Sequence, residues 1–549
     1  MEVAICKSSV MTVPQEEGGV VKIKREYLIQ EQRQGDANSK EEKKSRKRMS
    51  PETTTESPHV PYTLCKYVEH GKTCPFGRAC RHEHDIHAFF RKRDADIGSV
   101  CPVWNRHGYC PSGMNCRWAS SHTDWKQLKT IEKKKEEQIP IVESNRCDAI
   151  MRSIHKKEYV FQYTANTLED GNSHLPIEDP GKRVGCVVNN EPRPIDFRNK
   201  IYIAPMTTVG NLPFRRICVD FGADITCSEM VIARNLLKAQ SSEWALIRRH
   251  PSERLFGVQF AIGREEDACA VCELARREMD VDFVDLNAGC PMNALEHAGA
   301  GAGLLTKVGR LKRIVSGMLN NLGSLPLVVK IRTGDHENTS HRLLPQLQAL
   351  RGRGGERVQA VTIHGRTKQA RYTTAADWAY IRTCAAAQRT DLPAMEVIGN
   401  GDVLSEAAYW ECLAVPGVDG VMIGRGALIK PWLLTELKER RTWDISAGER
   451  LEIIKKFCDY GLEHWGSDEP GVARTRRFLL EWLSFLCRYV PVGLLERPQG
   501  IRQRVPAYCG RSELETVLGS REVKDWVWIS ERFLGKVEEG FSFTPKHRS

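Results

Sequence analysis

Short apolar runs alternate with segments of helical periodicity between residues 201 and 423, and this alternation is the strongest pattern in the chain. Amphipathic stretches such as residues 311–319 and 404–413 separate the runs. Strand–helix alternation repeated eight times favours a parallel (β/α)8 barrel of the TIM type. The predicted strands, rich in β-branched and aromatic residues, are 201–204, 225–228, 255–260, 283–286, 327–331, 360–363, 396–398 and 420–423.

Outside this region the pattern of polar and apolar residues changes. Residues 1–60 are too polar to bury a core and are predicted to be disordered. A charged, helix-like run at residues 126–138 opens a linker, and spacing such as that of residues 478–483 predicts helices after the barrel. The expected parts are a disordered basic tail (1–60), a Cys/His-rich region (61–125), a linker (126–195), the barrel (196–440) and a helical domain (441–549).

Composition and charge constrain compartment and partners. The 549 residues carry a formal net charge of +11, and eight arginines against two glutamates lie between residues 472 and 511, which suggests a polyanionic partner. A basic cluster at residues 43–48 fits either a nuclear-import signal or a solvated tail. No segment has the roughly 20 apolar residues of a membrane span, and no signal peptide pattern is seen. The 19 cysteines are expected to be free or metal-bound thiols, as in a reducing compartment. We expect the protein to be a monomer and to lie in the cytoplasm, the nucleus or both.

Two sets of Cys and His residues have the spacing of metal ligands. The first is spaced C-x8-C-x5-C-x3-H and the second C-x8-C-x5-C-x5-H. Three thiolates and one imidazole form a closed tetrahedral shell for zinc, and loops this short need such a constraint to fold. In the second set, His107 is a rival for the fourth position. The predicted zinc ligands are Cys65, Cys74, Cys80 and His84 in the first set, and Cys101, Cys110, Cys116 and His122 in the second.

The first set resembles the CCCH finger family, whose members bind single-stranded RNA. Such binding uses aromatic rings that stack on bases and cations that contact phosphates. The region offers the aromatic residues Tyr67, Phe76, Trp104 and Tyr109 and the cations Lys66, Lys72, Arg78 and Arg81. Some of these rings must pack the small finger cores instead, so the sequence assigns stacking to none of them individually.

All the predicted strands end in polar residues or glycine. In barrels of this type the active site lies at the carboxyl ends of the strands. Any one of these residues fits a structural cap, but the complete set favours a site. In chain order the ends carry Pro205, Met206 and Thr207; Glu229; Gln259; Asn287 and Cys290; Lys330 and Arg332; His364 and Arg366; Asn400, Gly401 and Asp402; and Gly424, Arg425 and Gly426.

The last two strand ends predict a phosphate-bearing cofactor, because the loops after strands 7 and 8 form the usual phosphate site of these barrels. Glycines there let backbone N–H groups approach an anion, and Arg425 can clamp it. Lys330 and His364 would project into the middle of the site, where a cation stabilises the reduced, anionic ring of a flavin. FMN fits better than a dinucleotide, because no G-x-G-x-x-G pattern follows a strand.

A single thiol stands at the end of the fourth predicted strand. Gly289 allows a sharp bend and Pro291 fixes the exit direction, so the turn would hold Cys290 in place. A thiol in this position suits the delivery of a proton. The alternative is that Cys290 is one of many buried, inert cysteines.

Five segments at the strand ends resemble those of the tRNA-dihydrouridine synthases. They are residues 204–207 (APMT), 285–291 (DLNAGCP), 329–334 (VKIRTG), 364–367 (HGRT) and 399–402 (GNGD). The two fingers ahead of the barrel and residues 474–482 (RTRRFLLEW) behind it resemble those eukaryotic members that act at tRNA position 47. Residues 298–303 are richer in glycine than the family pattern, which predicts a mobile loop.

The resemblance implies flavin-dependent reduction of uridine to 5,6-dihydrouridine in tRNA, and leaves mRNA open as a further substrate. NADPH would reduce FMN, the flavin would pass a hydride to carbon 6 of uracil, and Cys290 would give a proton to carbon 5. The ordinary pKa of a thiol, about 8.5, suits a proton donor at neutral pH. The implied FMN-binding residues are Pro205, Met206, Thr207, Gln259, Lys330, His364, Asn400, Gly401, Asp402, Gly424 and Arg425.

Two other classes of function remain open. A flavin barrel acting on a free pyrimidine, like the dihydroorotate dehydrogenases, would leave the fingers and the basic C-terminal region without a purpose. A CCCH RNA-binding protein with a catalytically silent barrel would not need the full set of strand-end residues. Arg366 and Arg371 fit either a contact to the base or phosphate or a structural ion pair, and some of Arg474, Arg476 and Arg477 are expected to face solvent and contact RNA.

Overall fold

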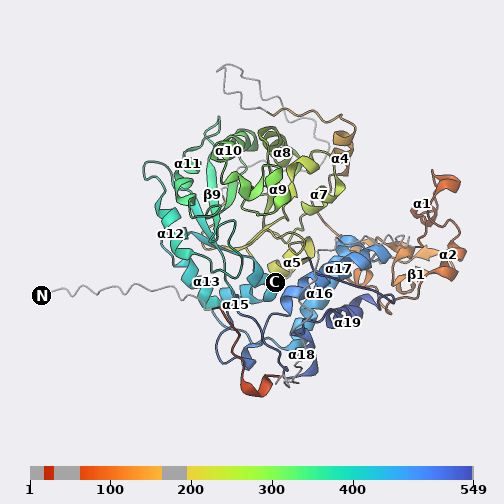
Figure 1. Ribbon diagram of the computed structural model, residues 1–549. Helices are drawn as coiled ribbons and strands as arrows, with labels where there is room; N and C mark the ends of the chain where they lie inside the picture. Colours follow the sequence, from red (N-terminus) through yellow and green to blue (C-terminus); the bar gives the residue numbers. More distant parts are fainter. Residues whose placement is uncertain (1–17, 30–61, 164–194, 547–549) are drawn as a thin grey trace, which may run out of the picture.

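The computed structural model describes residues 18–29, 62–163 and 195–546. In these ranges the chain forms a barrel, a helical domain beside it, and two small Cys/His modules beyond the helical domain (Figure 1). None of the helices in the described ranges is long and apolar enough to cross a membrane.

The eight predicted strands all form, and every neighbouring pair in the barrel is parallel. They are β3 Ile201–Ile203, β4 Ile225–Cys227, β6 Leu255–Ala261, β7 Phe283–Ala288, β8 Leu327–Arg332, β9 Val358–His364, β10 Glu396–Asn400 and β11 Gly420–Ile423. Pairing of β3 with both β11 and β4, and of β4 with β6, closes the sheet and confirms the predicted (β/α)8 fold. The apolar runs did not predict β5 Val231–Ile232, a short strand that pairs with the end of β6.

Helices surround the strands and continue beyond the barrel. Those of the barrel are α5 Leu212–Asp220, α6 Ala233–Leu236, α7 Ser241–Leu246, α8 Glu265–Glu278, α9 Asn293–His297, α10 Val308–Leu322, α11 Leu344–Ala349, α12 Trp378–Ala386, α13 Glu406–Leu413, α14 Arg425–Ile429 and α15 Leu433–Glu439. The helical domain contains α16 Ala447–Trp465, α17 Glu469–Leu486, α18 Glu513–Leu518 and α19 Val523–Leu534, which confirms the predicted change to helices.

The inside of the barrel is filled by side chains. The ring of Phe283 makes edge contacts with Phe197 and Tyr202, at centroid distances of 5.5 and 5.9 Å. Gly257 on the next strand makes room for it, since a Cβ there would lie 2.2 Å from the Phe283 ring. A ligand therefore has to bind above this packed layer, at a mouth of the barrel.

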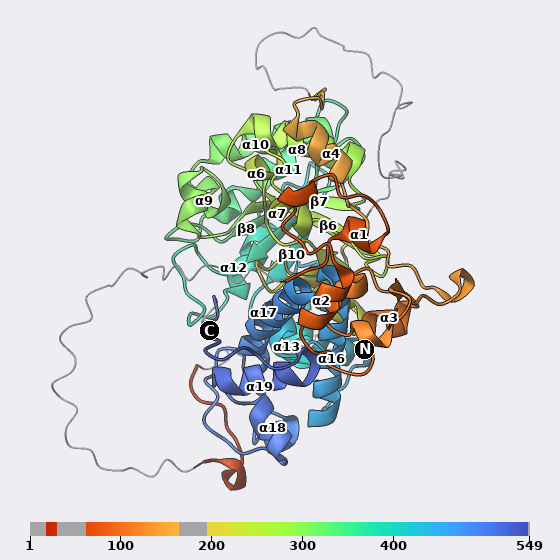
Figure 2. The same ribbon diagram turned by 90° about the vertical axis from the view of Figure 1, so that its right-hand side faces the viewer.

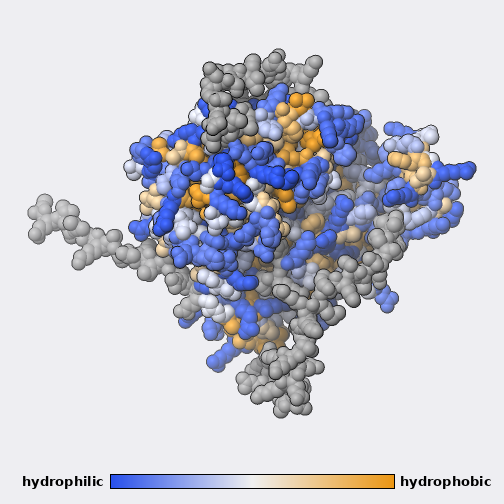
Figure 3. Space-filling model, turned by 45° about the horizontal axis from the view of Figure 1, so that its top comes forward, coloured by the Kyte–Doolittle hydropathy of each residue, from blue (hydrophilic) through white to orange (hydrophobic). Residues whose placement is uncertain are grey.

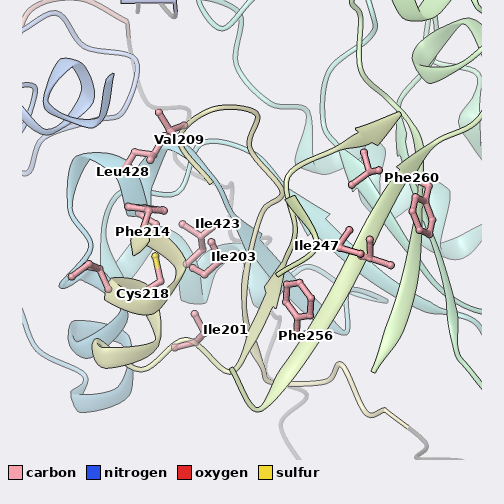
Figure 4. Packing of buried hydrophobic residues seen from close by; sticks show 14 of the residues in the cluster. Ile201, Ile203, Val209, Phe214, Cys218, Ile247, Phe256, Phe260, Ile423 and Leu428 are labelled. Carbon is pink, nitrogen blue, oxygen red and sulfur yellow. The ribbon is translucent and has the colours of Figure 1, made fainter. Parts of the chain in front are cut away.

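The outer faces of the strands pack against the helices. Ile201 and Ile203 of β3 and Ile423 of β11 lie beside Phe214 and Cys218 of α5 (Figure 4). Each of these side chains is at most 4% exposed, so their burial contributes on the order of 1.5–3 kcal/mol for each large aliphatic or aromatic group.

The helical domain continues this core. The ring of Trp482 in α17 meets Phe214 at a centroid distance of 5.6 Å, and its indole N–H donates to the carbonyl of Leu428 at 3.0 Å. A capping box formed by Ser446 and Glu449 starts α16, and the Asp468 side chain caps α17. The domain is thus anchored to the barrel through buried contacts.

Two segments differ from the sequence-based expectations. Residues 126–138 form no α-helix; they include β2 Lys129–Thr130, which pairs with β1 Thr123–Asp124, and a single 3-10 turn. Residues 18–29, expected in the disordered tail, pair with the C-terminal domain through bridges such as Val20 to Arg504 and Ile23 to Leu495 (Figure 1, red segment). Their apolar side chains pack on that domain, an interaction that local composition does not reveal. The basic cluster at 43–48 lies outside the described residues.

Candidate active site and zinc centres

The turn that carries Cys290 is held by a chain of buried amides. The backbone N–H groups of Cys290 and Gly289 donate to Oδ1 of Asn287, at 2.9 and 3.2 Å. The Asn287 side chain donates to Gln259 at 2.8 Å, and Gln259 donates to Asp285 at 3.0 Å. These contacts fix the turn from below, because parallel neighbours β6 and β7 bring the three side chains to one end of the barrel.

Burial raises the pKa of the partly buried Cys290 thiol. Nearby Arg332 and Lys330 oppose this shift without cancelling it. The thiol is therefore protonated at neutral pH, as a proton donor must be.

The glycine-rich run closes under this turn. The N–H of Ala302 donates to the carbonyl of Cys290 at 2.9 Å. Gly301 has a φ of +59°, and a Cβ there would lie 2.7 Å from the same carbonyl oxygen. The segment is buried from Gly299 to Leu305 and forms the 3-10 turn Gly301–Leu304. Its glycines thus serve close packing, which differs from the predicted mobile loop.

Lys330 and Asn400 lie side by side at the centre of the mouth. Nζ of Lys330 donates to Oδ1 of Asn400 at 3.1 Å, and Asn400 donates to the carbonyl of Met422 at 2.8 Å. Burial lowers the pKa of Lys330, while the nearby Asp285 favours its charged form. Among the described residues this ammonium has one acceptor, so it keeps donor capacity for an anionic ligand.

His364 is an uncharged group beside a cation. Burial first, and then Lys330 and other neighbouring cations, lower the pKa of His364 well below its ordinary value. Arg366 donates to Nε2 of His364 at 3.2 Å, so this nitrogen is the acceptor and Nδ1 carries the proton. The neutral imidazole can act as a hydrogen-bond donor.

Asp402 lies between two arginines. Its carboxylate accepts from Nη2 of Arg366 at 2.5 Å and from Nη2 of Arg425 at 2.8 Å. Arg366 also donates to the carbonyl of Thr374, and it is 2% exposed. Arg366 was expected either to contact the base or a phosphate or to form a structural ion pair, and the structure shows the ion pair, with Asp402. Arg371 is exposed.

The ends of β10 and β11 have the features of a phosphate site. The backbone N–H groups of Gly401 and Gly424 have no hydrogen-bond partner among the described residues. A Cβ at Gly424 would meet only Ala204, at 3.6 Å, and Met206, at 3.9 Å. Unpaired N–H groups beside the guanidinium of Arg425 suit an anion. The residues present therefore fit the phosphate of FMN.

The predicted FMN-binding residues do not all have the same surroundings. Pro205, Met206 and Thr207 follow β3, and Met206 lies against Gly424. Gln259 is 1% exposed, and both atoms of its amide are engaged with Asp285 and Asn287. It is thus positioned to hold the cysteine turn.

Several residues at the site carried no local sequence signal. The Tyr372 ring is 52% exposed and lies 4.0 Å from the guanidinium carbon of Arg425. Arg502, from the helical domain, reaches to 3.9 Å from Asp402 and donates to the carbonyl of Thr373 at 3.4 Å. Only the arginine excess between residues 472 and 511 pointed to a contact of this domain with the mouth.

Both predicted zinc sets come together. In each set the ligand atoms of the four residues lie within 4.8 Å of one another: Cys65, Cys74, Cys80 and His84 in finger 1, and Cys101, Cys110, Cys116 and His122 in finger 2. Three sulfurs and one imidazole nitrogen at this separation fit a tetrahedral zinc ion. His107 is not in the set; its Nε2 lies 3.1 Å from Glu463 of α16.

Finger 2 is docked on the helical domain. The Ser467 hydroxyl lies 3.1 Å from the sulfur of Cys110 and 3.2 Å from that of Cys116. The N–H of Arg117 donates to the carbonyl of Ser467 at 2.8 Å. Glu463 joins this finger to the barrel, because it binds both His107 and Arg216 of α5.

Finger 1 contacts finger 2 and leaves the rings of Tyr67 and Phe76 exposed. A small core of Leu64, Phe89 and Met114 joins the two fingers. Tyr67 and Phe76 in finger 1 are 43% and 65% exposed. In finger 2, Trp104 donates to the carbonyl of Ile131, and the Tyr109 hydroxyl accepts from the N–H of Ile141, so both rings are used in packing. Figure 2 shows finger 1 toward the viewer, with its helices α1 Lys66–Glu69 and α2 Ile86–Lys92 in front of the rest of the molecule.

The fold and the site define a (β/α)8-barrel protein with a cluster of cations and a protonated cysteine at one mouth. The profile of the family "Dihydrouridine synthase (Dus)" matches residues 202–480. Proteins named "tRNA-dihydrouridine(47) synthase [NAD(P)(+)]-like" are similar to the chain over nearly its whole length. That of Rattus norvegicus is 42% identical, covering 94% of this chain and 86% of its own. That of Homo sapiens is 42% identical, covering 90% and 82%.

A fungal relative, "tRNA-dihydrouridine(47) synthase [NAD(P)(+)]" of Coprinopsis cinerea, is 39% identical over 88% of this chain and 86% of its own. Identity at this level over most of both chains is far above what a shared barrel alone produces. The chain belongs to the dihydrouridine synthase family.

Proposed function

We propose that this protein reduces uridine to 5,6-dihydrouridine in tRNA, with FMN as the bound cofactor and NADPH as the reductant. The observation that carries the proposal is the meeting of the Cys290 thiol and the Lys330, His364 and Arg425 side chains at one barrel mouth. The names of the relatives support position 47 of the tRNA and an NAD(P) reductant.

The chain's own residues would divide the work as follows. Gly401, Gly424 and Arg425 would hold the phosphate of FMN, and Lys330 would lie beside its ring. When bound, FMN supplies the hydride that carbon 6 of the uracil accepts. Cys290 would donate its proton to carbon 5, and a solvent proton would then restore the thiol. Taken together, uridine, NADPH and one proton give dihydrouridine and NADP⁺.

The RNA would be held outside the barrel by exposed side chains of the helical domain and of finger 1. Arg474 and Arg477 of α17 are exposed and can meet phosphates, whereas Arg476 is buried and donates to the carbonyls of Leu534 and Gly535. Only some of these three arginines face solvent, as the sequence suggested. Finger 1 would add stacking surface through Tyr67 and Phe76.

The test combines a spectrum with product analysis. The purified protein should be yellow with a flavin spectrum that bleaches on addition of NADPH. Incubation with an unmodified tRNA transcript and NADPH should convert one uridine, the one at position 47, to dihydrouridine by mass spectrometry. A transcript with cytidine at position 47 is the matched control substrate.

A colourless protein that binds tRNA tightly would replace this proposal with that of an RNA-binding protein with a silent barrel. Reduction of free uracil or uridine at the same rate as tRNA would point instead to a free pyrimidine substrate.

A further inference from the structure

A polar cavity lies on the rim of the barrel, outside the mouth described above. It has a volume of about 510 Å³ and opens between the beginnings of α8 and α10. Its walls come from the loop after β6, the loop after β7 and the first turns of the two helices. The lining residues are 263–266, 297–299, Lys307, Arg310, Arg313 and Ile314.

The cavity has an excess of positive charge. Arg264, Lys307, Arg310 and Arg313 line it, against the carboxylates of Glu265 and Glu266. Arg313 lies 3.9 Å from Glu265. Among the described residues the other three cations have no ion pair. Three unpaired cations around one cavity favour an anionic ligand, because each gains attraction that the protein itself does not provide.

Backbone groups add to this preference. Arg264 is the N-cap residue of the 14-residue helix α8, and Lys307 is that of the 15-residue helix α10. Neither helix has a side-chain cap. The N–H of Arg310 donates to the carbonyl of Lys307, and the other first-turn N–H groups have no partner among the described residues. Two helix beginnings and three cations therefore converge on the same space.

The cavity is connected to the cysteine turn by the glycine-rich run. Gly299 has a φ of +75°, and a Cβ there would lie 2.4 Å from Nη1 of Arg310. A Cβ at Gly263 would lie 2.1 Å from the carbonyl oxygen of Ala298. Bare backbone at both positions keeps the cavity open and lets Arg310 rest on the run. Ala302, at the other end of that run, donates to the carbonyl of Cys290.

We propose that this cavity binds a phosphate, and that the phosphate belongs to the backbone of the substrate RNA. The proposal rests on the function proposed above. The cations come from the outer ring of helices, whereas the reacting base would lie inside the mouth. A ligand that reaches from the cavity to the inside of the mouth has to be a polymer. Its backbone phosphates lie beside the nucleotide whose base enters the mouth. The face of the molecule drawn in Figure 3 is largely hydrophilic, with several hydrophobic patches.

NADPH also carries phosphates, so the experiment has to separate the two sources. The variant Arg264→Ala/Arg310→Ala removes two of the cations. The matched control is Arg276→Ala/Lys312→Ala, which removes two charges from the same two helices at positions that do not line the cavity. A third variant, Arg264→Lys/Arg310→Lys, keeps the charge and reports on folding.

Binding of unmodified tRNA to the oxidised protein is measured by filter titration at two salt concentrations, without turnover. The alanine pair should weaken binding about tenfold or more, the usual value of charge-assisted hydrogen bonds, and should reduce the salt slope by about one. The lysine pair should recover most of the affinity. The KM for NADPH, from flavin reduction without RNA, should stay at the wild-type value.

Equal tRNA affinity for the alanine pair and the control would overturn the proposal. A raised KM for NADPH with unchanged tRNA affinity would assign the cavity to the reductant. Because the titration needs no chemistry, a wild-type protein that binds tRNA but forms no dihydrouridine would count against the proposed function and leave this site standing.

Discussion

At the scale of single residues, the site depends on groups that burial holds in one protonation state. Cys290 stays protonated and His364 stays neutral, because both are removed from water. Glu229 differs: burial raises the pKa of its carboxyl, which accepts from the N–H of Thr208, to about 7, so this group changes charge near neutral pH. Cations and neutral donors, with the Asp402 carboxylate between two arginines, therefore surround the space where an anionic cofactor would lie.

Replacing Cys290 with Ala should lower the rate of dihydrouridine formation by about 10²–10⁴, the usual contribution of a positioned acid. Flavin content and its reduction by NADPH should not change, because the thiol takes no part in them. Single-turnover mass spectrometry measures the first quantity and the visible spectrum the others. Cys509→Ala, at an exposed cysteine, is the control. An unimpaired Cys290→Ala enzyme would remove this residue from the mechanism.

Arg425→Ala should reduce the flavin that copurifies with the protein, because it removes the guanidinium beside the unpaired N–H groups of Gly401 and Gly424. Arg425→Lys should retain part of it, since the charge remains and the two-armed geometry is lost. The ratio of flavin to protein absorbance reports both. Full flavin content in the alanine variant would show that the phosphate lies elsewhere.

At the scale of elements, the strands were predictable and the contacts between distant segments were not. Alternation of apolar runs located all eight strands, and the strand ends located Cys290, Lys330 and Arg425, because a parallel barrel brings such ends together. The docking of finger 2 had no such signal. Ser467 and Glu463 are ordinary helix-end residues by sequence, and only the tertiary fold brings them to the sulfurs and to His107.

Glu463→Gln should destabilise the protein by about 3–5 kcal/mol, since it leaves the buried side chains of Arg216 and His107 without their anionic partner. Burial opposes the charge of Glu463, but His107 and Arg216 outweigh it and lower the pKa of Glu463 to about 2. Because the pKa of Glu463 is lower in the folded protein than its ordinary value of 4.5, the ionised carboxylate stabilises the fold at pH values above 4.5. This stabilisation is lost as the pH falls toward 2.

Thermal unfolding at several pH values provides the measurement. The wild-type melting temperature should fall more steeply below pH 4.5 than that of the glutamine variant. Lys455→Ala breaks an exposed pair with Asp459 in the same helix and should change stability by no more than about 1 kcal/mol. Parallel curves for wild type and Glu463→Gln would contradict the assignment.

The exposed rings of finger 1 should contribute to RNA binding. Tyr67→Ala/Phe76→Ala is expected to weaken tRNA binding by about 1–3 kcal/mol per lost stacking contact. The melting temperature should stay constant, because neither ring belongs to the core shared by the fingers. Trp528→Ala, at an exposed aromatic residue of α19, is the matched control in the same filter titration. Unchanged affinity in the finger variant would assign these rings to another partner.

At the scale of the whole molecule, the two fingers are attached differently. Finger 2 contacts the helical domain through Ser467 and the barrel through Glu463, while finger 1 is held by its small core with finger 2. The sequence alone predicted the same role in RNA binding for both fingers. It also placed residues 18–29 in the tail, because their contacts with Leu495 and Arg504 involve residues nearly 500 positions away.

Loss of zinc from one finger at a time should separate these roles. Cys74→Ser in finger 1 should weaken tRNA binding and leave the melting temperature of the main transition unchanged. Cys110→Ser in finger 2 should lower that temperature as well, because unfolding of the module removes the contacts of Ser467 and Glu463. Calorimetry and filter binding measure the two effects, and both proteins should keep their flavin. Identical melting curves for the two variants would show that docking adds no stability.

The contact of Ser467 with two zinc-ligand sulfurs has a reciprocal consequence. If zinc orders finger 2 so that it fits the helical domain, the docked domain must raise the affinity of that finger for zinc by the same factor. Among the described residues finger 1 has no hydroxyl beside its ligand sulfurs, and it is docked through the small core that it shares with finger 2. When zinc becomes scarce, finger 1 would therefore lose its zinc first. The protein would then lose part of its affinity for RNA, while its barrel stays folded and keeps its flavin.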